Sequence, residues 1–200
     1  MSTYALVTRA PAGVVAAAVR AGRTGGFVVE DPLGVIVLFD PPGRTYASTG
    51  RLAKPARALV RYSGAPAWLL LCDEELAEAV LIDAEGEWPL RWARGWEPPG
   101  DPARYLADRQ DRDAYCADLA ARFGAADRGG ALAMVRNDPV PGERPVPLPD
   151  LLRRLCAVFD LPDVAVGRSL LDGDEPGLHD AARIDVQPPA GVWHRLFAGA

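Results

Sequence analysis

Residues 66–96 constrain the fold more than any other part of the chain, because they predict three consecutive short strands. The three apolar runs cover residues 68–72, 78–83 and 88–93. Short acidic or glycine-containing segments separate them, and connections of this kind join neighbouring antiparallel strands. Pro89 cannot donate a backbone hydrogen bond to a neighbouring strand, so the third strand is expected at an edge of the sheet. The stretch therefore predicts a β-meander that ends in an edge strand.

The start of the chain predicts a β-α-β-β arrangement. Residues 4–9 form an apolar run typical of a strand. Pro11 and Gly22 then bracket a helical pattern of valine and alanine, since proline suits the first helical position and glycine follows a last turn. Residues 27–30 and 35–40 are two apolar runs on either side of a turn that contains proline and glycine, which predicts a hairpin.

The second half of the chain predicts helices more than strands. Asp101 and Pro102 form an N-cap and first-turn pair for a helix that runs to residue 123, with Gly124 as its stop. Alternating charges around Asp111 leave a break in this helix as the alternative. The other elements expected here are a strand over residues 131–135, a proline-rich connection over 137–149, a helix over 149–159, a strand over 183–186 and a short helix or docked tail over 192–197.

Together these elements predict an α+β fold. We expect a mostly antiparallel sheet, with a β-α-β-β start followed by a β-meander, packed by helices from the second half. A single integrated domain over residues 1–200 is favoured, because the second half has few strands and many loops. The linker at residues 97–101 is the alternative boundary, between a sheet-rich half (1–96) and a helix- and loop-rich half (102–200).

The composition limits the classes of partner. The 200 residues carry a formal net charge of −5, and an acidic chain lacks the concentrated basic surface that neutralises nucleic-acid phosphates. No stretch approaches the roughly 20 apolar residues of a transmembrane helix. The N-terminus lacks the charged start and apolar run of a signal peptide. We therefore expect a cytoplasmic protein that binds neither nucleic acid nor membrane.

Residues that enzymes use as nucleophiles or metal ligands are sparse in this chain. Cys72, Cys116 and Cys156 lie in apolar or helical runs without ligand or redox spacing, so they are expected to be buried and reduced. His179 and His194 lie near the C-terminus, and no cysteine stands at ligand spacing from either. The sequence predicts no catalytic residue, no metal site and no cofactor, and it favours a non-enzymatic role.

Alternating tryptophan and arginine residues form the first candidate binding surface. On a continuous strand, residues 88, 92, 94 and 96 would share one face. Burial in the core is the commoner fate of such a row, and a protein-binding face is the alternative because Trp and Arg are enriched in interface hot spots. The predicted partner-binding residues are Trp88, Arg91, Trp92, Arg94 and Trp96.

The second candidate surface is an expected loop over residues 41–50, whose polar side chains could hold a ligand. The predicted ligand-loop residues are Arg44, Tyr46, Ser48 and Thr49. Residues 52–60 follow as an expected short helix, and Pro55 restricts where that helix can start.

Three functions are compatible with these surfaces. The first is a protein-binding module, with an immunity- or inhibitor-type protein as one concrete version, since surface complementarity requires no catalytic residues. The alternative is a small-molecule-binding domain or enzyme with a site between the sheet and the second half, using acidic residues with Arg44, Tyr46 or His179. The third is a structural subunit of a larger assembly. None of these functions fixes an oligomeric state.

Overall fold

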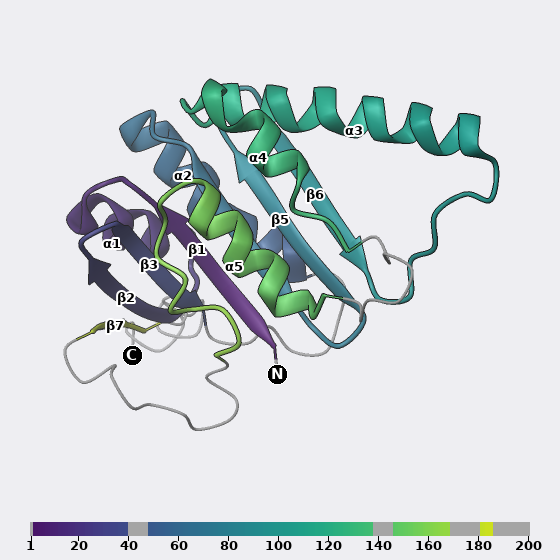
Figure 1. Ribbon diagram of the computed structural model, residues 1–200. Helices are drawn as coiled ribbons and strands as arrows, with labels where there is room; N and C mark the ends of the chain where they lie inside the picture. The colour runs from purple at the N-terminus through teal and green to yellow at the C-terminus, as the bar shows by residue number, and fades with distance from the viewer. Residues whose placement is uncertain (1, 40–47, 138–145, 169–180, 186–200) are drawn as a thin grey trace, which may run out of the picture.

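A seven-stranded antiparallel sheet is the centre of the computed structural model, which describes residues 2–39, 48–137, 146–168 and 181–185 (Figure 1). The strands are β1 (Thr3–Thr8), β2 (Gly26–Asp31), β3 (Gly34–Phe39), β4 (Ala67–Cys72), β5 (Leu76–Ile82), β6 (Glu87–Ala93) and β7 (Ala182–Ile184). Their order across the sheet is β6-β5-β4-β1-β3-β2-β7, so the sheet is open. The helices are α1 (Ala12–Ala21), α2 (Ser48–Ser63), α3 (Pro102–Arg122), α4 (Gly129–Ala133) and α5 (Leu148–Val158), with a 3-10 turn η1 (Ala126–Arg128).

Helices cover both faces of this sheet (Figure 1). Successive strand residues alternate between two apolar clusters. Leu6 belongs to the cluster that includes residues of α1 and α2, and Val7 to the cluster that includes residues of α3, α4 and α5. The expected α+β fold is confirmed. Helices from the second half cover one face as predicted, and the two helices from the first half cover the other.

The predicted hairpin and meander are present. Val28 pairs with Val37 between β2 and β3, Leu69 with Val80 between β4 and β5, and Val80 with Pro89 between β5 and β6. Among the described strands, β6 lies at one edge of the sheet, where the proline is tolerated.

The row of alternating Trp and Arg residues is shorter than predicted. β6 ends at Ala93, and Gly95 has a φ of 67° in the turn that follows. Because the strand stops there, Arg94 and Trp96 do not continue the face shared by Trp88 and Trp92.

Helix α2 begins earlier than expected. Ser48 and Thr49, predicted in a loop, lie in its first turn, and Pro55 lies inside the helix. The helix packs closely on the end of α1, since a Cβ atom on Gly22 would lie 2.7 Å from Cγ of Pro55. A glycine at residue 22 therefore permits the approach of these two helices.

Helix α3 starts and ends where the sequence predicts and runs without a break at Asp111. The Asp101 carboxylate accepts a hydrogen bond from the backbone of Ala103 at 3.0 Å, and Gly124 has a φ of 80° after the last turn. The buried residues of this helix, Cys116, Leu119 and Ala120, all belong to its second half. The first half projects beyond the edge of the sheet (Figure 1).

The strand predicted over residues 131–135 is wrong, because the chain forms α4 there. This short helix packs so closely on α3 that a Cβ atom on Gly129 would lie 2.7 Å from Cα of Ala117. Contact with α3 therefore decides the conformation of a segment whose own pattern is ambiguous.

Farther along the chain, the strand expected at 183–186 is present as β7, whereas residues 192–197 lie outside the described ranges.

An aromatic cluster joins the sheet to the helices of the second half. The ring of Trp68 on β4 lies 5.5 Å from that of Phe159 and 6.0 Å from that of Phe123. The predicted burial of all three cysteines is confirmed.

None of the helices within the described ranges is both long and apolar enough to cross a membrane.

Candidate functional site

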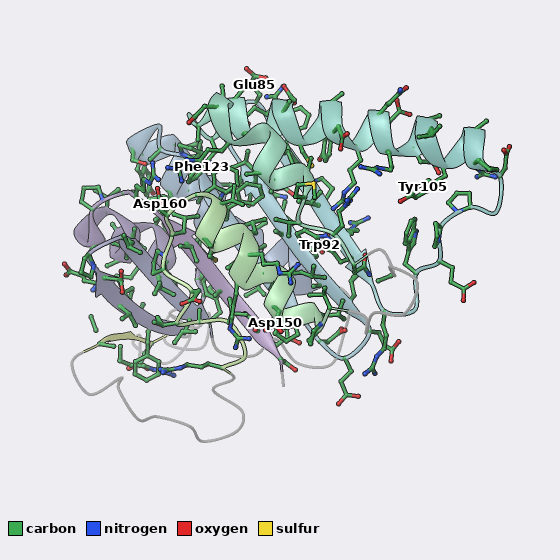
Figure 2. All side chains as sticks on the ribbon, in the orientation of Figure 1. Glu85, Trp92, Tyr105, Phe123, Asp150 and Asp160 are labelled. Carbon is green, nitrogen blue, oxygen red and sulfur yellow. The ribbon has the colours of Figure 1, made fainter. Side chains whose placement is uncertain are left out.

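A cleft with a volume of about 270 Å³ lies between the outer edge of β6 and the projecting half of α3. Figure 2 shows Trp92 on β6 and Tyr105 on the side of α3 that faces this strand. The lining residues are Arg91, Trp92, Ala93 and Trp96 from β6 and the turn after it, Tyr105, Asp108, Arg109, Arg112 and Asp113 from α3, and Arg136 and Asn137 from the segment after α4. We call this the β6–α3 cleft.

The α3 wall of the cleft continues a buried stripe of the same helix. Tyr105, Arg109 and Arg112 follow one another at spacings of four and three, which keeps them on one helical face. The same spacing leads on to Cys116 and Leu119, which are buried in the core. The face that packs in the second half of the helix is therefore cationic and aromatic in the first half, where it borders the cleft.

Two side chains bind the outer backbone of β6. The Tyr115 hydroxyl donates to the carbonyl of Pro89 at 3.0 Å, and the Asn137 amide donates to that of Ala93 at 2.6 Å. Both carbonyls face away from β5, and alternate residues of an antiparallel strand point their backbone groups the same way. The backbone of Arg91, midway between them, therefore faces the cleft.

The back of the cleft is held by a shared hydrogen-bond acceptor. The Trp92 indole and the Arg112 guanidinium both donate to the carbonyl of Val135, at 2.9 Å and 3.1 Å. The guanidinium carbon lies 5.9 Å from the centre of the Trp92 ring. The Nε–H group of Arg112 is buried and has no hydrogen-bond partner in the part of the chain that the structure describes.

The charge of the β6–α3 cleft is opposite to that of the whole chain. Four guanidinium groups against two carboxylates leave a formal charge of +2 on its lining, in a chain of net charge −5. Arg91 is paired, since its Nε lies 2.5 Å from the buried carboxylate of Glu78. The guanidinium carbon of Arg109 lies 5.9 Å from the centre of the Tyr105 ring, and Arg109 forms no ion pair with any described residue.

The structure brings together three of the five predicted partner-binding residues: Arg91, Trp92 and Trp96. Trp92 is 2% exposed and Trp96 is 39% exposed, so the first belongs to the core and the second to the surface. Arg94 does not line the cleft, and its exposed guanidinium lies 3.8 Å from the Glu75 carboxylate.

Trp88, the fifth predicted residue, lies at a separate cluster near the β5–β6 turn. Its indole donates to the Asp83 carboxylate at 3.1 Å, and the Arg122 guanidinium lies 3.8 Å from its ring centre. Burial acts to raise the pKa of Asp83, but hydrogen bonds from Trp88, the backbone of Gly86 and Glu85, and Arg122 outweigh it and lower the pKa. This cluster fixes the C-terminal half of α3 to the sheet.

The predicted ligand loop does not form a described site. Arg44 and Tyr46 lie outside the described ranges, as do both histidines, and Ser48 and Thr49 belong to α2. Within the ranges that the structure describes, no three His, Cys, Asp or Glu side chains come together as a metal-binding group.

Sequence reasoning missed the cleft residues that lie outside β6 and its turn. They are Tyr105, Asp108, Arg109, Arg112, Asp113, Arg136 and Asn137. From the sequence, the alternating charges around Asp111 indicate a break in the helix as the alternative to a continuous one, and they do not indicate a cleft. The spacing of Tyr105, Arg109 and Arg112, in line with the apolar residues farther along the helix, is the signal that could have distinguished one inward face.

Comparison with known proteins adds no assignment: no family model, no curated protein and no solved structure matches this chain. The β6–α3 cleft is therefore the feature from which a function can be inferred.

Proposed function

We propose that this chain is a protein-binding module that receives an acidic segment of a partner protein in the β6–α3 cleft. The observation that carries the proposal is the composition of the cleft. Trp96 and Tyr105 gather there with four arginines, and the core residue Trp92 lies in the wall that they share. Trp, Tyr and Arg are the residues enriched in interface hot spots, where they contribute most of the binding free energy.

Charge complementarity supports an acidic partner. The cleft lining has a formal charge of +2 although the chain has a net charge of −5, so the local charge is not a consequence of overall composition. Complementary potentials speed association and disfavour wrong partners. A basic or neutral segment would gain neither advantage here.

The projecting half of α3 offers apolar area beside the cleft. Trp96 at the rim is 39% exposed, and Leu106 on the projecting half is 57% exposed. Single exposed apolar residues are common on protein surfaces. Trp96 borders a cationic aromatic cleft, and Leu106 belongs to the helix that forms one wall of it. A partner segment that fills the cleft can therefore also cover Trp96 and exclude water from the charged contacts.

The proposed role is non-enzymatic, and an immunity- or inhibitor-type protein is its concrete version. We further propose a cytoplasmic location with a protein partner, and no binding to nucleic acid or membrane. The three buried cysteines, Cys72, Cys116 and Cys156, are unpaired, as is usual in a reducing compartment.

Site-specific photo-crosslinking in the native cell tests this function. A photoreactive amino acid replaces Trp96 in one variant and Leu33 in a control variant. Leu33 is exposed in the turn between β2 and β3, strands distant from β6 in the sheet. The proposal predicts one partner crosslinked from position 96 and not from 33, at a segment rich in Asp and Glu. Crosslinking to the same partner from both positions, or from 33 alone, would contradict it.

A small-molecule-binding domain is the second candidate function, and the size of the cleft favours it. Its volume of about 270 Å³ approaches the roughly 300–1,000 Å³ of known ligand sites, and it lies between the sheet and the second half. A metabolite bound only by the folded state must raise the melting temperature. A thermal-shift screen of carboxylic acids supports this candidate if an acid stabilises wild-type protein but not the Trp96→Ala variant.

A further inference from the structure

We infer that the β6–α3 cleft contains a carboxylate subsite formed by Arg112 and Arg109. The inference rests on the proposed function, since the partner's acidic segment supplies the carboxylate as an aspartate or glutamate side chain. It adds the residues that recognise the charge and the chemistry of the group they recognise.

Arg112 is the first half of the subsite. Its Nη2 donates to the Val135 carbonyl at 3.1 Å, which fixes the orientation of the guanidinium against the back of the cleft. Its Nε–H is buried and has no hydrogen-bond partner among the described residues. Because that atom is closed to solvent, a ligand in the cleft would act on Arg112 through the charge of its guanidinium, which no described carboxylate pairs with. A carboxylate in the cleft would neutralise this charge.

Arg109 is the second half. It stands three residues before Arg112 on the same face of α3, where side chains lie close enough to interact. The only described contact of its guanidinium is with the ring of Tyr105. Neighbouring like charges destabilise a helix unless an anion lies between them. One carboxylate has two oxygens and can contact both arginines.

The aspartates of the cleft do not fill this role. Asp108 and Asp113 line the same cleft, but no ion pair joins either of them to Arg109 or Arg112. Both guanidinium groups thus keep their charge available to an external anion.

The aromatic walls define what accompanies the carboxylate. Trp96 and Tyr105 border the cleft on opposite elements, so an apolar or aromatic group next to the carboxylate would pack between them. Phenylacetate has both parts, and phenylacetamide is its neutral counterpart of nearly the same shape. These two compounds probe the subsite without the partner.

The experiment follows the arginine Nε–H signals of the ¹⁵N-labelled full chain by NMR while each compound is added. The Arg112 signal is assigned by its loss in the Arg112→Lys variant. We expect phenylacetate, and not phenylacetamide, to shift the Arg112 and Arg109 signals. Arg109→Gln should weaken phenylacetate binding about ten- to hundredfold, as expected for a lost hydrogen bond to a charged group. Arg104→Gln removes the same charge from the same helix outside the cleft and should change binding less than about twofold.

Two results would overturn the subsite: equal binding of acid and amide, or unchanged phenylacetate binding by Arg109→Gln. Because Arg109 makes no described hydrogen bond, its variant tests the subsite even if replacing Arg112 unfolds the protein. Failure of the proposed function can be distinguished from failure of the subsite. If only the proposed function is wrong, phenylacetate binds as expected and no protein is crosslinked from position 96.

Discussion

Trp92 on β6 and Arg112 on α3 donate hydrogen bonds to one and the same carbonyl, that of Val135. The segment after α4 is thereby held against both walls of the β6–α3 cleft. Because Trp92 is also part of the core, the site and the fold depend on the same contact. Variants of the cleft must therefore be separated into those that change stability and those that change binding.

Trp92→Ala and Trp96→Ala should differ sharply in stability. Trp92 is 2% exposed, so its removal should lower the free energy of unfolding by about 3–5 kcal/mol. Trp96 is 39% exposed, and its removal should cost less than about 1 kcal/mol. Urea denaturation of both variants checks this. A loss at Trp96 as large as that at Trp92 would show that Trp96 is a core residue and unsuitable as a binding residue.

Gly129→Ala should weaken the packing of α4 on α3. The new Cβ would lie 2.7 Å from Cα of Ala117, so we expect a loss of about 1–3 kcal/mol in the free energy of unfolding. Gly130→Ala is the matched control, because its Cβ would meet nothing within 4 Å. Alanine is the better helix former, so the control should gain about 0.5–1 kcal/mol. Denaturation curves that rank the two variants in the opposite order would refute this packing.

The Asp83 carboxylate should make stability depend on acid pH. Its pKa is lowered in the folded protein, where hydrogen bonds from Trp88, the turn backbone and Arg122 outweigh the effect of burial. Its contribution is therefore complete above the unfolded pKa of about 3.9 and is lost as the pH falls through the lower folded value. Asp83→Asn should reduce the loss of stability below about pH 4. Identical acid-unfolding curves for wild type and Asp83→Asn would contradict the network.

The cysteines should react with thiol reagents only when the protein unfolds. Burial, with a contribution from Asp163, raises the pKa of Cys156 to about 12, and burial with Asp73 raises that of Cys72 to about 11. Thiolate is the reactive form, and all three cysteines are buried. Labelling at pH 8 should follow the unfolding rate, while a Tyr62→Cys variant, at an exposed position, should label at once. Rapid labelling of the native wild type would contradict this burial.

Local sequence patterns were sufficient to predict most strands of the sheet. Pro89 marked β6 as an edge strand, and the turn with Pro32 and Gly34 marked the hairpin, because both signals act through their own backbone. The strand predicted over residues 131–135 was wrong because its conformation depends on a contact with another element. Its apolar run fits a strand or a helix, and the close contact of Gly129 with Ala117 selects the helix.

The cleft was only half predictable. Trp92 and Trp96 were recognised because they are rare, large residues near one strand. Arg109 and Arg112 were not, because charges at helical spacing usually face solvent. Their position depends on α4 and η1, which hold the second half of α3 and leave the first half over the edge of β6. That relationship is tertiary, so no local pattern contains it.

The affinity of the crosslinked partner for purified cleft variants shows whether the β6–α3 cleft is the binding site. Isothermal titration calorimetry would compare wild type with the Trp96→Ala/Arg109→Gln double variant and with Arg104→Gln. We expect the double variant, with its fold intact by circular dichroism, to bind at least about a hundredfold more weakly, and Arg104→Gln to bind within about twofold of wild type. Wild-type affinity in the folded double variant would show that the β6–α3 cleft is not the binding site.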